Sequence, residues 1–178
     1  RHALAAGAVG TSNLNLAFGG FDPATPGNTA ATEEWTAAGA TDTIQNDGQV
    51  FYRSDTGDMK VTARVYGTGS WATGGNMNTA SGDQSGFGLQ TAAIAAGGTT
   101  GAGNYNNHSE LYNGASWTEL AAMNTPRRSA SGFGASTAGV NASGQTTGGG
   151  VTANVESWNG SAWTEIAEVN TAGRGLSA

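Results

Sequence analysis

The chain has 178 residues, a formal net charge of −6, 30 glycines, no cysteine and only 11% charged residues. Its seven basic residues are scattered, which argues against the clustered positive surface that nucleic-acid binding needs. The absence of cysteine excludes disulfides and thiolate metal sites. No apolar stretch approaches the roughly 20 residues that span a bilayer as a helix. Five tryptophans among short β-branched and aromatic runs predict many short strands in one domain, or at most two small ones.

Residues 1–38 are predicted to form the first half of a repeating β unit. The apolar run and glycine pair at 14–20 return at 92–98, and Glu33-Glu34-Trp35 returns at 110–112. Both segments have the short, alternating pattern of strands that end in tight turns. The N-terminal region therefore predicts strands that are repeated later in the chain.

Residues 39–66 interrupt this pattern and are predicted to be an inserted hairpin module. The offset between the matched segments is 77 or 78 residues, which leaves about 32 inserted residues relative to the later period. Within the insertion, 48–61 contains two alternating runs around the polar turn Ser54-Asp-Thr-Gly57. This arrangement is typical of a β-hairpin.

Residues 67–178 contain the clearest internal repeat, with a period of 46 residues. The unit 81–126 reads as four strands, at 85–88, 91–96, 109–112 and 116–122, and the unit 127–172 repeats it. Small residues alternate with larger ones along these strands, which predicts sheets stacked tightly face to face. The same spacing relates three tryptophans, predicted to lie in the core, and three Asn-Thr pairs: Trp71, Trp117 and Trp163; 78–79, 124–125 and 170–171.

A unit of this length, with Gly-Gly after the second strand and aromatic residues in the third and fourth, resembles the kelch repeat. The resemblance covers two complete units and two halves beside the insertion. It implies an all-β fold in which each unit is a four-stranded blade of a partial β-propeller. It also implies that Tyr112 with Trp117, and Trp158 with Trp163, pack between blades.

A narrower resemblance is carried by 116–128 and 156–166, which are similar to kelch-like repeats of phage virion proteins. The hairpin 48–61 is similar to one found in phage tail-fibre proteins. This implies a structural and adhesive part of a virion, either tail fibre or appendage, located outside the cell. Its partners would be other virion or scaffold subunits and a host-surface glycan. The alternative is a secreted bacterial kelch-like adhesin, lectin or extracellular scaffold.

About three units are too few for a closed propeller, which has 4–8 blades. Three explanations are open: a longer polypeptide, closure by two or more chains as a homo-oligomer, or an open or trimeric stack. We favour the longer polypeptide, because exposed strand edges at both ends would invite aggregation.

Catalysis finds little support, so the sequence predicts no enzyme, no catalytic residue, no cofactor and no metal site. The polar turns at 46–48 and 55–58 lack the ordered acidic spacing of a calcium loop. Glu33, Glu110 and Glu156 share one repeat position, which predicts a structural role, bonding backbone groups or a neighbouring unit. A sugar-acting propeller hydrolase or mutarotase stays a third hypothesis, which glycan turnover would support.

Recognition is expected in the connections between the second and third strands, because these vary most between units. Variable polar loops on a rigid β scaffold are where binding usually occurs. The predicted binding residues are Asp22, Tyr105, Asn106 and His108. The alternative is that these residues are only solvated connectors.

Overall fold

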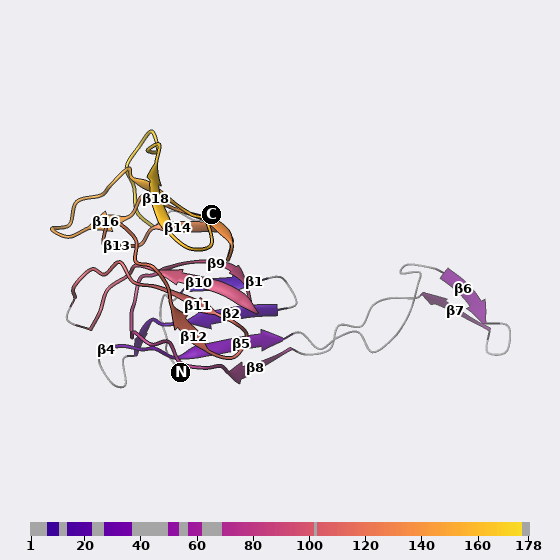
Figure 1. Cartoon of the computed structure of the whole chain (residues 1–178). Helices are drawn as coiled ribbons and strands as arrows, with labels where there is room; N and C mark the ends of the chain where they lie inside the picture. Colours follow the sequence, from indigo (N-terminus) through magenta and orange to yellow (C-terminus); the bar gives the residue numbers. More distant parts are fainter. Residues whose placement is uncertain are drawn as a thin grey trace.

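The computed structural model describes residues 7–10, 14–22, 27–36, 50–53, 57–61, 69–101 and 103–175 (Figure 1). Every regular element within these ranges is a β-strand, which confirms the predicted all-β fold. Over the same ranges no helix is long and apolar enough to cross a membrane.

Three antiparallel four-stranded sheets follow one another along the chain, each with its strands in sequence order. The first sheet contains β1 (Gly7–Gly10), β2 (Leu14–Phe18), β5 (Thr32–Thr36) and β8 (Ser70–Thr73). The second contains β9 (Ser85–Leu89), β10 (Ala92–Ala96), β11 (Ser109–Tyr112) and β12 (Trp117–Glu119). The third contains β14 (Ser131–Ala135), β15 (Ala138–Ala142), β17 (Val155–Trp158) and β18 (Trp163–Ile166).

Three short antiparallel pairs complete the described structure. They are β3 (Phe21–Asp22) with β4 (Gly27–Asn28), β6 (Val50–Arg53) with β7 (Asp58–Val61), and β13 (Arg127–Arg128) with β16 (Gln145–Thr146). The β6–β7 hairpin lies within the segment 39–66, and Figure 1 draws it apart from the three sheets. It falls between β5 and β8, the third and fourth strands of the first sheet.

The second sheet lies between the other two, because its first strand β9 contacts both β1 and β14. The three sheets form a series in chain order. We call the face of a sheet that points toward the start of this series its N-side face, and the opposite face its C-side face. Alternate residues of a strand point to opposite faces. The interface between the first and second sheets is called the first interface, and that between the second and third the second interface.

An aromatic side chain against glycines lets the sheets of the second interface approach closely. Phe87 of β9 is only 3% exposed and packs edge-on against Trp163, with 6.2 Å between ring centroids. A Cβ at Gly132 would lie 2.9 Å from the Phe87 ring, and one at Gly139 would overlap it. The prediction of tight face-to-face stacking is confirmed here.

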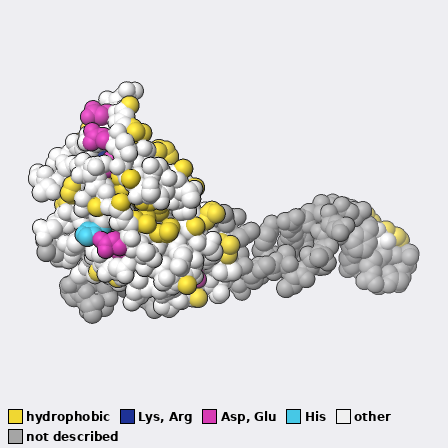
Figure 2. All heavy atoms as spheres, in the orientation of Figure 1, with side chains coloured by type: hydrophobic (Ala, Val, Ile, Leu, Met, Phe, Trp, Pro, Cys, Tyr) yellow, Lys and Arg dark blue, Asp and Glu magenta, His cyan; other side chains and the backbone are white. Residues whose placement is uncertain are grey.

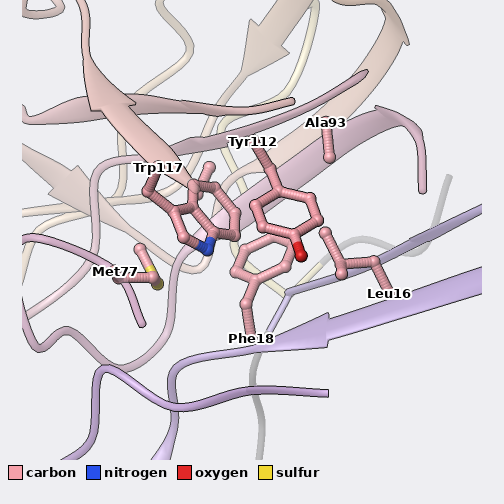
Figure 3. Packing of buried hydrophobic residues seen from close by; sticks show 7 residues of the cluster. Leu16, Phe18, Met77, Ala93, Tyr112 and Trp117 are labelled. Atoms are coloured by element: carbon pink, nitrogen blue, oxygen red, sulfur yellow. The ribbon is translucent and has the colours of Figure 1, made fainter. Parts of the chain in front are cut away.

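The first interface contains a comparable apolar core (Figure 3). Phe18 of β2 packs edge-on against Trp117 of β12, with 5.0 Å between ring centroids, and Tyr112 lies 5.1 Å from the same indole. The Trp117 Nε1–H donates to the hydroxyl of Thr32 at 2.9 Å, so the one polar atom of the indole is satisfied across the interface. The cluster consists of Leu16, Phe18, Met77, Ala93, Ala95, Tyr112 and Trp117.

The prediction that all three repeated tryptophans are buried is wrong for Trp71. Trp117 and Trp163 are buried, whereas Trp71 is 53% exposed. It occupies the N-side face of the first sheet, where the described part of the chain places no further sheet. Its ring contacts Trp35 at 5.4 Å, in the same geometry as the pair Trp158 and Trp163 of the third sheet.

A buried carboxylate joins the second sheet to the connection that enters it. Glu110 of β11 is only 2% exposed. It accepts hydrogen bonds from the main-chain N–H groups of Asn78 and Thr79, at 2.8 and 2.9 Å, and from the Asn78 side chain at 3.1 Å. Hydrogen bonds to a buried charged acceptor are stronger than neutral ones. We call this arrangement the carboxylate clasp.

The clasp recurs in the third sheet. Glu156 of β17 accepts from the main-chain N–H groups of Asn124 and Thr125, at 2.7 and 3.1 Å. Here the fully buried Arg127 forms an additional ion pair with Glu156 and donates to the carbonyl of Asn154 at 2.8 Å. The prediction that the repeated glutamates bond backbone groups or a neighbouring unit is confirmed at Glu110 and Glu156, where the bonded groups are main-chain N–H groups of the preceding connection.

Candidate functional site

The connections between second and third strands gather at one end of the sheets. In the first sheet this connection carries the β3–β4 pair, and in the second Thr99 bridges to Gly82 and Tyr105. In the third, β16 pairs with β13, and Gln145 bridges to Val151. The side chain of Asn28 donates to the carbonyl of Thr99, so the first two connections touch. We call this end of the molecule the loop end.

Arg128 of β13 organises a polar cluster at the loop end. Its guanidinium donates to the carboxylate of Asp83 at 2.9 Å and to the side-chain carbonyl of Gln145 at 3.0 Å. The same carbonyl accepts a hydrogen bond from Arg174 at 2.8 Å. The side chains of Arg128 and Asp83 keep 31% and 35% of their surface in solvent. The cluster is therefore held in place yet open to a ligand.

Tyr105 forms the aromatic wall of this cluster. The guanidinium carbon of Arg128 lies 5.1 Å from the centre of its ring, a cation–π arrangement. Tyr105 is half-buried. Of the predicted binding residues, it is the one whose side chain contacts Arg128.

Asn106 instead lies inside its loop. It is buried, its side-chain N–H donates to the hydroxyl of Ser81 at 2.9 Å, and its side-chain oxygen accepts from the main chain of His108. Its backbone carbonyl accepts from the N–H of Arg127. These bonds give Asn106 a role in shaping the connection that carries Tyr105.

His108 is the last residue of the same connection, directly before β11, and it faces the outer strand β12 of its sheet. Its Nδ1 is 3.4 Å from the carboxylate of Glu119 in β12. Figure 2 shows the histidine beside an acidic side chain on the molecular surface. His108 is therefore paired across strands, whereas Tyr105 belongs to the Arg128 cluster. Asp22 lies in β3, and its side chain is outside the described residues.

The chemistry of the loop end is that of non-covalent recognition. It offers one aromatic face, guanidinium groups, a carboxylate and a side-chain amide, which suits ring stacking and hydrogen bonds to hydroxyl groups. Among the described residues no group of three or more His, Asp or Glu side chains could hold a metal.

Four residues of the cluster were not predicted from the sequence: Asp83, Arg128, Gln145 and Arg174. One signal was available, because Arg128 and Arg174 are 46 residues apart and share a repeat position. A second signal lies in the backbone, since Asp83 and Ser129 have positive φ values of 56° and 51° at equivalent positions. The contact between Tyr105 and Arg128 depends on the stacking of two sheets and has no local sequence signature.

The fold class is thus an array of face-stacked, four-stranded antiparallel sheets. No protein-family model matches the chain, and no curated protein matches it. A solved structure that does match is that of YjhT, with a TM-score of 0.62 and 13% sequence identity over 93% of this chain and 46% of that one. The chain thus spans less than half of YjhT, and the likeness supports the all-β fold alone.

Proposed function

We propose that this chain is a kelch-like repeat protein whose three sheets are blades of a β-propeller. We further propose that it is a structural and adhesive part of a phage virion, a tail fibre or appendage, that presents its loop end to a glycan on the host surface. The phage assignment is supported by two resemblances in sequence. Residues 116–128 and 156–166 resemble kelch-like repeats of phage virion proteins, and the hairpin 48–61 resembles one of phage tail-fibre proteins.

The observation that carries the recognition role is the Arg128 cluster with Tyr105. Arg128, Asp83 and Gln145 come from connections of different sheets and hold one another in place through direct hydrogen bonds. A prearranged polar site loses less conformational entropy on binding than a mobile loop. Its small size predicts weak affinity for each copy, and a fibre compensates through many copies acting together.

A glycan array probed with monomeric and with bead-displayed protein tests the recognition role. We expect signal only from the multivalent form, and loss of that signal in Tyr105→Ala. The matched control is Leu89→Ala, which truncates an exposed side chain of β9 in the second sheet, outside the Arg128 cluster. Absence of any signal from the multivalent form would contradict glycan recognition, and sub-micromolar binding by the monomer would contradict the multivalent mechanism.

The virion assignment has its own test, which is peptide mass spectrometry of purified source particles. We expect peptides of this chain together with capsid or tail proteins. Their recovery from a culture supernatant free of particles would favour the secreted adhesin, lectin or scaffold instead. Turnover of a glycan by the purified protein would contradict the non-enzymatic assignment.

A further inference from the structure

Among the described residues, no carboxylate bonds the Asn-Thr pair of the last connection, in contrast to the two earlier pairs. The N–H groups of Asn78 and Thr79 bond Glu110, and those of Asn124 and Thr125 bond Glu156. The third pair follows β18, and both of its residues are exposed: Asn170 and Thr171. Within the described residues no acceptor faces their main-chain N–H groups.

The backbone before this third pair already has the conformation of the other two. The N–H of Met77 donates to the carbonyl of Ala30, at 2.7 Å, and that of Met123 to the carbonyl of Asn107, at 2.9 Å. At the equivalent position Val169 donates to the carbonyl of Ala153, at 3.0 Å. The connection after β18 therefore already presents the backbone donors of a third clasp, and no glutamate of the described residues accepts from them.

The C-side face of the third sheet is exposed in the same region. Phe133 is equivalent to Phe87, yet it is 49% exposed whereas Phe87 is 3% exposed. Ile166, equivalent to the partly buried Leu120, is 44% exposed. This face has the apolar residues of an interface between sheets, and no sheet formed by the described residues covers it.

The N-side face of the first sheet carries the complementary features. Trp35 and Trp71 form the aromatic pair that is buried at the same place in the other two sheets. Glu33 pairs with Ala17 in the register that Glu110 has with Ala95, so it occupies the clasp position of its sheet. The first sheet thus has the half-interface that the third sheet lacks.

We propose that two copies of this chain associate head to tail, with the N-side face of the first sheet in one copy on the C-side face of the third sheet in the other. Trp71 of one copy then covers Phe133 of the other, as Trp163 covers Phe87 within the chain. The carboxylate of Glu33 accepts the N–H groups of Asn170 and Thr171. This interface continues the two that the fold already contains.

Two copies joined in this way bring together six four-stranded sheets, twice the three of one chain, a number within the range of closed propellers. Heterologous contacts of this kind close into rings when the rotation between copies permits it. The proposed interface lacks one hydrogen bond that both internal interfaces have. There the hydroxyl groups of Thr32 and Ser109 accept from the indole N–H groups of Trp117 and Trp163. The equivalent residue of the third sheet is Val155, which has no hydroxyl group. The association is therefore reversible and weaker than the packing within a chain.

Sedimentation velocity of the full chain over a range of concentrations tests the proposal. We expect the wild type to shift with concentration from 17.7 kDa to twice that mass. Phe133→Asp and Trp71→Asp should each remain monomeric, because each places a charge in every interface of the dimer. Both side chains are about half exposed in the single chain, so both variants should fold, which circular dichroism checks.

Mixing the two variants distinguishes head-to-tail contact from any other mode. The Phe133→Asp copy keeps its N-side face and the Trp71→Asp copy its C-side face, so the mixture should regain a heterodimer with one intact interface. Leu89→Asp, at a position 54% exposed, is the matched control and should dimerise like the wild type. A wild type that stays monomeric throughout would overturn the proposal and leave both faces to further sheets of a longer polypeptide. A variant mixture that does not associate, or species larger than the dimer, would also overturn it.

Discussion

The first and second interfaces solve the same packing problem with different polar chemistry. In both, a glutamate of the third strand accepts two main-chain N–H groups of the preceding connection. In the first interface, Ser81 and Asn106 form a neutral hydrogen bond beside the clasp. In the second, Arg127 replaces Ser81 and forms an ion pair with Glu156.

Comparison of the two interfaces separates the part of the clasp that both share from the part that occurs only in the second. The carboxylate and the backbone donors recur, whereas the arginine is present once. A buried ion pair contributes little net stability but makes the loss of either partner costly, because an uncompensated charge is left behind. The second interface should therefore be the more sensitive to mutation without being the more stable.

Removal of Glu156 should have the largest effect. Glu156→Ala leaves the fully buried Arg127 without its carboxylate and should lower the free energy of unfolding by about 3–5 kcal/mol. Glu110→Ala, the matched variant of the first interface, leaves backbone donors unpaired and should cost about 1–3 kcal/mol. Urea unfolding followed by tryptophan fluorescence measures both. Equal losses would show that Arg127 adds nothing to the sensitivity of the second interface.

Building the neutral Ser81–Asn106 hydrogen bond of the first interface into the second should lower the free energy of unfolding by less. Positions 127 and 152 are equivalent to Ser81 and Asn106, so Arg127→Ser with Thr152→Asn rebuilds the first interface in the second. The loss of stability should be about 1 kcal/mol, because Glu156 keeps its main-chain donors once the arginine is removed, as Glu110 does in the first interface without an arginine. The same urea experiment checks it, with Arg127→Ser alone as the control. A double variant as unstable as Glu156→Ala would contradict this account.

The last effect appears only at high pH and concerns Tyr112, whose hydroxyl has a carboxylate partner. The equivalent residue of the second interface is Trp158, which bonds a main-chain carbonyl instead. The Tyr112 hydroxyl donates to Glu34 at 2.6 Å, and burial together with that hydrogen bond raises the pKa of Tyr112 from 10.0 to about 12. A raised pKa in the folded state stabilises the fold below pH 10, and this contribution is lost as pH rises toward 12. We expect stability to fall over that range, and the fall to shrink in Tyr112→Phe while it persists in Tyr105→Phe. An unchanged profile in Tyr112→Phe would contradict the assignment.

The repeating architecture was accessible from the sequence because its signals are local. The period of 46 residues marked equivalent glutamates, and their structural role was predicted correctly for Glu110 and Glu156. Spacing also located the strands, since alternation of small and large residues follows directly from strand geometry. The error at Trp71 arose because a repeat position identifies the face on which a residue lies but not whether another sheet covers that face.

The polar site was less accessible, because its contacts join different sheets. Arg127 and Arg128 are adjacent in sequence, yet one is fully buried and the other is partly exposed at the loop end. Tyr105 and Asn106 are likewise adjacent, and one lies over Arg128 while the other bonds Ser81. Which neighbour turns inward depends on the backbone bonds that the connection makes, and composition does not encode these.

The central claim is that the second and third sheets each clasp the connection before them through one carboxylate. Amide hydrogen exchange measured by NMR at low protein concentration tests it most directly. The account predicts slow exchange at Asn78, Thr79, Asn124 and Thr125, whose N–H groups bond buried carboxylates, and fast exchange at Asn170 and Thr171. Similar exchange rates at all three pairs in the monomer would contradict it.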